Sequence, residues 1–131
     1  MAEKILKKYL IALVVLLALD LTWIFLIMAD FYQAQFSGFL RPESVPIWSA
    51  ILPWLLVPLG IVLFVDKVSR NKKQSLIYGG IYGLILYGVY DFTNYATLAN
   101  WTLTMVVLDV LWGIFLCGVV SFLTKYFSRS S

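Results

Sequence analysis

Three aspartates, Asp20, Asp91 and Asp109, stand in sequence that is otherwise apolar enough to enter a lipid bilayer. An ionised Asp costs about 2.5–3.5 kcal/mol near the centre of a membrane span, so such residues usually face the protein interior and mark functional sites. Their carboxyl groups could accept a proton, bind a cation, or work as a pair in acid–base catalysis. No lysine or arginine lies within the apolar stretches to pair with them. Because burial and neighbouring like charges both favour the neutral acid, we expect at least one of the three to be protonated at neutral pH.

The acids must be positioned by membrane helices, since four segments are long enough to cross a bilayer, which needs about 20 mostly apolar residues. These segments run approximately over residues 9–29, 46–65, 76–98 and 103–124. The first is too long for a cleaved signal peptide and contains Asp20, so we expect it to be retained. The predicted fold is all-α: a single domain, 1–131, forming an integral membrane bundle of four transmembrane helices.

The basic residues predict the orientation of this bundle. All but one of the ten lysines and arginines lie before the first segment, between the second and third, or after the fourth; Arg41 is the exception. Such an excess of positive charge is typical of the cytoplasmic side, which predicts that both termini are cytoplasmic. The positive charges are therefore orientation signals, and no nucleic-acid partner is expected.

In this orientation the three acids share one depth. They lie six to nine residues from the outer ends of their segments, which at 1.5 Å per residue is about 9–14 Å below the outer boundary. Three-and-four spacing adds aromatic and amide side chains to the same inward faces. We predict a ligand-binding site at this level, made of Asp20, Trp23, Tyr87, Asp91, Asn94, Asp109 and Trp112. The chain has no histidine, which excludes histidine-based acid–base chemistry and the usual zinc ligand sets. No metal site, cofactor or particular catalytic residue is predicted.

A structural role for the same residues is the alternative. The first and fourth segments run in opposite directions, and each contains Asp-x-x-Trp. Side by side, Asp20 would be level with Trp112, and Trp23 with Asp109. Each indole N–H could then donate to the opposite carboxyl group. The sequence leaves open whether the acidic layer is such a reciprocal clasp or a pocket.

Three further features concern flexibility and assembly. Pro53 and Pro58 should kink the second helix, either as a static bend or as a hinge. Gly79 and Gly83 allow two helix backbones to approach closely, either within the bundle or in a homodimer. The aromatic segment 30–45 is expected at the outer membrane interface, with a lid over the site as the alternative.

The motifs around the acids also resemble a known family. Asp20-Leu-Thr-Trp23, Tyr90-Asp91-Phe-Thr-Asn94 and Asp109-Val-Leu-Trp112-Gly113 are together similar to a family of small four-helix bacterial predicted membrane proteins, catalogued as a domain of unknown function. The resemblance covers essentially the whole chain and implies the bacterial cytoplasmic (inner) membrane. It implies no particular substrate or reaction.

Three functions remain open from the sequence. The first is a membrane protein, surrounded by lipid, that binds or transports a proton, a cation or an amphiphilic small molecule at the acidic layer. The second is a membrane enzyme, or an enzyme subunit, that modifies lipid with a carboxylate pair. The third is a structural subunit that binds a partner protein in the membrane.

Overall fold

A computed structural model describes residues 2–36 and 46–128, and all regular structure in these two ranges is helical. The elements are α1 (Ala2–Thr22), the π-helical turn η1 (Trp23–Ile27), α2 (Ala29–Phe36), α3 (Ile47–Gly60), the π-helical turn η2 (Ile61–Val65), α4 (Asp66–Val68), α5 (Lys72–Thr97) and α6 (Leu103–Ser128).

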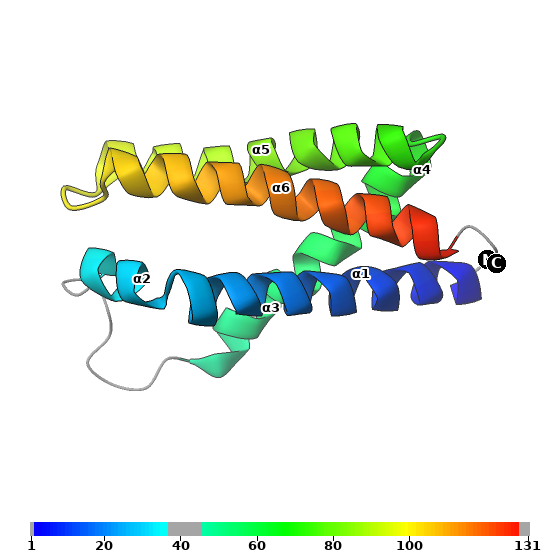
Figure 1. The fold of residues 1–131 in the computed structure, drawn as a ribbon, viewed down its shortest axis with the longest axis horizontal. Coiled ribbons are helices and arrows are strands. Elements are labelled where there is room, and N and C mark those ends of the chain that lie inside the picture. Colours follow the sequence, from blue (N-terminus) through cyan, green and yellow to red (C-terminus); the bar gives the residue numbers. More distant parts are fainter. Residues whose placement is uncertain (1, 37–45, 129–131) are drawn as a thin grey trace.

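Three long helices run alongside one another and a fourth crosses them (Figure 1). α1, α5 and α6 follow the long axis of the molecule, whereas α3 runs obliquely across them. The start of α1, the joint between α4 and α5, and the end of α6 lie at one end of the molecule. α2 and the turn between α5 and α6 lie at the other. The segments that carry most of the basic residues therefore share one end.

Three stretches are long and apolar enough to cross a membrane: Ala2–Ile27, Ile47–Val68 and Leu103–Ser128. α5 was predicted as a further span. It has the same length as α6, 26 residues, but its glycines, tyrosines and Asp91 make it less apolar. The all-helical membrane architecture is thus supported by three helices of the described chain, and the predicted count of four is not reached by apolarity alone.

The C-terminal end of the first helix differs from its predicted form. α1 begins at Ala2, gives way to η1 at Trp23, and the helical path is interrupted at Met28, whose φ and ψ are −111° and 7°. α2 then occupies the beginning of the segment predicted to lie at the interface. The remainder, 37–45, lies outside the described residues.

Close approach of α5 and α6 depends on glycine. A Cβ atom on Gly79 would overlap the side chain of Ser121, and one on Gly83 would overlap the backbone of Gly113. The small-residue motif therefore forms the contact within the bundle, the first of the two arrangements expected for it. A homodimer stays a prediction.

α3 contains two prolines but continues through both. Pro53 and Pro58 lie inside the helix, which widens into η2 after Gly60. Two tyrosine hydroxyls from neighbouring helices donate to its backbone carbonyls: Tyr9 to Leu55 at 2.8 Å and Tyr82 to Val57 at 3.1 Å. These bonds attach α3 to α1 and α5.

An ion cluster that was not predicted from the sequence joins three helices at the end of the molecule where α1 begins and α6 ends. Asp66, only 5% exposed, pairs with Lys8 at 2.7 Å and with Lys125 at 3.0 Å. The cluster links α1, α4 and α6. The two lysines were interpreted only as orientation signals, and nothing in their spacing indicated a shared carboxylate.

Candidate functional site

Asp20 lies at the end of the buried stripe of α1. Ala12, Leu16 and Asp20 follow one another at four-residue intervals and are the buried residues of this helix. The Trp112 indole donates to one carboxylate oxygen at 2.9 Å, and the Trp54 indole donates to the other at 2.8 Å. The predicted Asp20–Trp112 contact is present, and Trp54 of α3 is a second donor that the sequence did not indicate.

The other half of the predicted reciprocal clasp is wrong. The Trp23 indole does not donate to Asp109; it donates to the Tyr32 hydroxyl at 2.9 Å. Its ring stacks on Trp112, with centroids 4.3 Å apart and planes 4° from parallel. Trp23 begins the π-helical turn, and the interruption at Met28 then brings Tyr32 of α2 within reach of its N–H. A prediction made with a continuous 3.6-residue period could not include either effect.

Asp91 and Asp109 form a carboxyl pair between α5 and α6. Asp91 is fully buried, and the side chains of Asp109 and Trp101 are close enough to interact with it. Neither Asp91 oxygen makes a hydrogen bond of ordinary geometry within the described chain. The pair exists because Gly83 lets α5 approach α6 at Gly113, one turn of α6 beyond Asp109.

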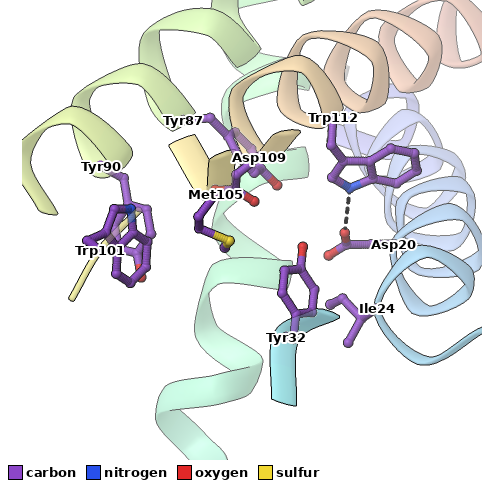
Figure 2. A pocket seen from close by; sticks show the side chains of 9 residues that line it. All are labelled: Asp20, Ile24, Tyr32, Tyr87, Tyr90, Trp101, Met105, Asp109 and Trp112. Carbon is purple, nitrogen blue, oxygen red and sulfur yellow. Dashed lines mark hydrogen bonds between the residues drawn. The ribbon is translucent and has the colours of Figure 1, made fainter. Parts of the chain in front are cut away.

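A cavity of about 260 Å³ opens beside this pair (Figure 2), and we call it the acid–aromatic cavity. It is lined by Asp20, Ile24, Tyr32, Tyr87, Tyr90, Trp101, Met105, Asp109 and Trp112. These residues come from α1, η1, α2, α5, α6 and the turn before α6. Figure 2 shows the Tyr32 hydroxyl pointing into the space between Asp20 and Asp109.

The structure places four of the seven predicted site residues on the wall of this cavity: Asp20, Tyr87, Asp109 and Trp112. The other three lie outside the lining. Trp23 supports Trp112 by stacking, and Asp91 is buried next to Asp109. Asn94 is half-buried one turn further along α5, beside Tyr90. The three acids do converge, as predicted from their common depth, since Asp20 and Asp109 line one cavity and Asp91 adjoins it.

Four aromatic residues of the site were not predicted: Tyr32, Trp54, Tyr90 and Trp101. Tyr90 precedes Asp91 and could have been suspected from that position. Trp101 stands in the short turn between α5 and α6, where the chain reversal places it edge-on to Tyr90 with ring centroids 5.9 Å apart. Tyr32 and Trp54 belong to elements whose approach depends on helix crossing, which the sequence pattern does not encode.

The site combines carboxyl groups with aromatic faces. Within residues 2–36 and 46–128, no group of three or more acidic, cysteine or histidine side chains is arranged to hold a metal ion. Carboxyl groups can exchange protons or attract a cation, and tyrosine and tryptophan faces attract cations through their ring quadrupoles. Carboxyl groups that can take up a proton or a cation thus lie beside ring faces that can attract an organic cation.

Comparison with known proteins agrees with the membrane character of the fold. Residues 5–126 match the family described as "Predicted membrane protein (DUF2177)". No curated protein and no solved structure matches the chain. The match includes the three apolar stretches, apart from residues 2–4 and 127–128, and all residues of the acid–aromatic cavity. The three apolar stretches indicate a multi-pass membrane protein, and the chain belongs to this family of predicted membrane proteins, whose function is unknown.

Proposed function

We propose that the chain binds the cationic group of a small molecule at the acid–aromatic cavity, with protons occupying the acids when the cation is absent. The observation that carries this proposal is the adjacency of Asp91 and Asp109, which form no ion pair with any lysine or arginine of the described residues.

The ion pairs of the described chain lie away from the carboxyl groups of the site. They are those of Asp66 with Lys8 and Lys125, at the opposite end of the bundle from α2. Two adjacent carboxyl groups in an apolar setting resist simultaneous ionisation, because each charge raises the energy of the other. A bound cation or a proton relieves that repulsion, so either one stabilises the site.

The aromatic lining favours an organic cation over a bare metal ion. Five of the nine lining side chains are rings: Tyr32, Tyr87, Tyr90, Trp101 and Trp112. Ring faces recognise quaternary ammonium groups, which are weakly hydrated and lose little solvation energy on burial. A cavity of about 260 Å³ suits a group of that size rather than a whole lipid headgroup and chain.

The proposed setting is the bacterial cytoplasmic membrane. α5 would be the fourth span, because it lies along α6 for most of its length, and the basic end would face the cytoplasm. Asp109 is six residues from the start of α6, or about 9 Å along the axis, which would place the cavity in the outer half of the bilayer.

Tryptophan fluorescence of the purified protein in detergent micelles tests the proposal, because Trp101 and Trp112 line the cavity. Choline and tetramethylammonium should each cause a saturable change in emission, and 3,3-dimethylbutanol, the uncharged analogue of choline, should not. The apparent affinity should rise with pH if the cation displaces protons. Asp109→Asn should abolish saturable binding.

Asp30→Asn is the matched control. It makes the same chemical change on α2, at an exposed position at the same end of the molecule. It should bind choline as the unaltered protein does. Equal choline binding by the Asp109→Asn and Asp30→Asn variants would refute the proposed site.

A further inference from the structure

A second cavity, of about 420 Å³, adjoins the acid–aromatic cavity on the side of α3. It is lined by Pro53, Val57, Leu86, Tyr87, Tyr90 and Asp109, and we call it the α3–α5 groove. Tyr87, Tyr90 and Asp109 line both cavities. The Asp109 carboxyl group therefore stands at the boundary between a polar, aromatic space and an apolar one.

The groove exists because α3 diverges from α5 toward its N-terminal end (Figure 1). The backbones of α5 and α6 come close to this oblique helix mainly at its C-terminal turn, η2. The backbone of α1 also comes close to α3 itself. The Tyr82 hydroxyl bond to the Val57 carbonyl joins α5 to α3 at the narrow end. From Val57 toward the N-terminal end of α3 the two helices separate, and the groove is therefore open at the side of the bundle.

The lining of the groove changes in character along its length. Pro53, Val57 and Leu86 supply hydrocarbon surface, and Pro53 and Leu86 are also exposed on the outside of the bundle. Asp109 supplies the carboxyl group among these described lining residues, and it lies where the groove meets the acid–aromatic cavity. An amphiphile has this same polarity: a hydrocarbon chain at one end and a polar group at the other.

We propose that the α3–α5 groove is a lateral entrance that holds the hydrocarbon chain of the ligand, while its cationic group lies at Asp109. The ligand is then a membrane-resident amphiphile that enters from the bilayer between α3 and α5, not a water-soluble cation. This inference rests on the proposed function, because it uses the same carboxyl group for the head of the ligand.

A homologous series of n-alkyltrimethylammonium ions, from methyl to octyl, tests the inference with the purified full-length protein in detergent. Affinity should increase with chain length, by at most about fourfold for each methylene group that is buried, and then level off once the groove is full. The octyl ion carrying a photoreactive diazirine in its chain should label α3 and α5 at the groove, and excess tetramethylammonium should reduce that labelling.

Leu86→Trp is the informative variant, because a larger side chain should fill the groove without changing any carboxyl group. It should bind tetramethylammonium normally and lose the gain in affinity with chain length. Leu84→Trp is its matched control, since Leu84 is exposed on the same helix and belongs to neither lining. It should keep that gain.

The outcomes separate the inference from the proposed function. If tetramethylammonium binds through Asp109 but affinity is independent of chain length, the groove does not hold the chain and the inference is overturned. Equal loss of the chain-length effect in the Leu86→Trp and Leu84→Trp variants would overturn it as well. If tetramethylammonium does not bind at all, the proposed function fails, and the inference fails with it.

Discussion

The Trp112 indole nitrogen donates a 2.9 Å hydrogen bond to the carboxylate of Asp20 and so joins α6 to α1 across the interior of the bundle. Trp54 of α3 donates to the second oxygen of the same carboxylate. One acid thus accepts hydrogen bonds from two other helices. This arrangement satisfies Asp20 and leaves the Asp91–Asp109 pair as the part of the acidic layer with fewer protein donors.

Removing the Trp112 donor should destabilise the bundle. In Trp112→Phe one oxygen of Asp20 loses its partner. The coupling between the two side chains should be about 0.6 kcal/mol, the average for interhelical hydrogen bonds in membranes, and at most about 1.7 kcal/mol. A double-mutant cycle with Asp20→Ala, which removes the acceptor, followed by thermal unfolding in detergent, measures that coupling. Trp48→Phe is the control, because Trp48 is 71% exposed. A coupling of zero would show that the bond contributes nothing to stability.

The Asp20–Trp112 contact was predictable because both residues lie on regular helices. Antiparallel helices with matching Asp-x-x-Trp spacing place these two side chains level, and the structure agrees. The same reasoning failed for Trp23, because η1 and the interruption at Met28 change the direction of side chains after Thr22. Helical periodicity is informative only where the period is constant.

Contacts that depend on helix crossing could not be predicted. Trp54 reaches Asp20 because α3 runs obliquely past α1, and the angle of that crossing is set by packing over the whole interface. Asp66 was missed for a different reason. It stands beside Lys67 in a charged joint, where exposure is the normal expectation, but Lys8 and Lys125 from distant segments enclose it.

Alanine at Gly83 should weaken the α5–α6 contact. The Cβ atom of the alanine would overlap the backbone of Gly113, which cannot move aside as a flexible side chain would. We therefore expect the free energy of unfolding to fall by about 1–3 kcal/mol. Gly88→Ala on the same helix is the matched control, because a Cβ there meets open space. Its higher helix propensity should leave stability unchanged or raise it by up to about 1 kcal/mol. Thermal unfolding of both variants provides the comparison, and equal stabilities would contradict the proposed packing role of Gly83.

Asp66→Asn should lower the stability of the bundle by removing the ion cluster at its basic end. The substitution leaves Lys8 and Lys125 beside one another without their common carboxylate. The side chains of Lys8 and Lys125 are 31% and 19% exposed. The loss of stability should therefore fall between the roughly 1 kcal/mol of a surface ion pair and the roughly 3–5 kcal/mol of a buried one. Lys67→Gln changes a charge at an exposed neighbouring position and should have little effect on stability. Chemical denaturation at low and high salt measures both variants, and a neutral Asp66→Asn would exclude a stabilising role for the cluster.

Infrared spectroscopy should detect at least one protonated carboxyl group among Asp20, Asp91 and Asp109 at neutral pH. Asp91 and Asp109 adjoin each other in an apolar interior, and a proton held by the pair removes the repulsion between two charges. The carbonyl stretch of a protonated acid lies apart from the carboxylate bands, so it can be followed in the unaltered protein and in Asp91→Asn, Asp109→Asn and Asp30→Asn variants. The band should disappear or shift in the first two variants and persist in the third. Adding tetramethylammonium should reduce its intensity in the unaltered protein, because the cation takes the place of the proton. If all three acids are ionised before any cation is added, the carboxyl pair does not store a proton, and the exchange of proton for cation at this site is excluded.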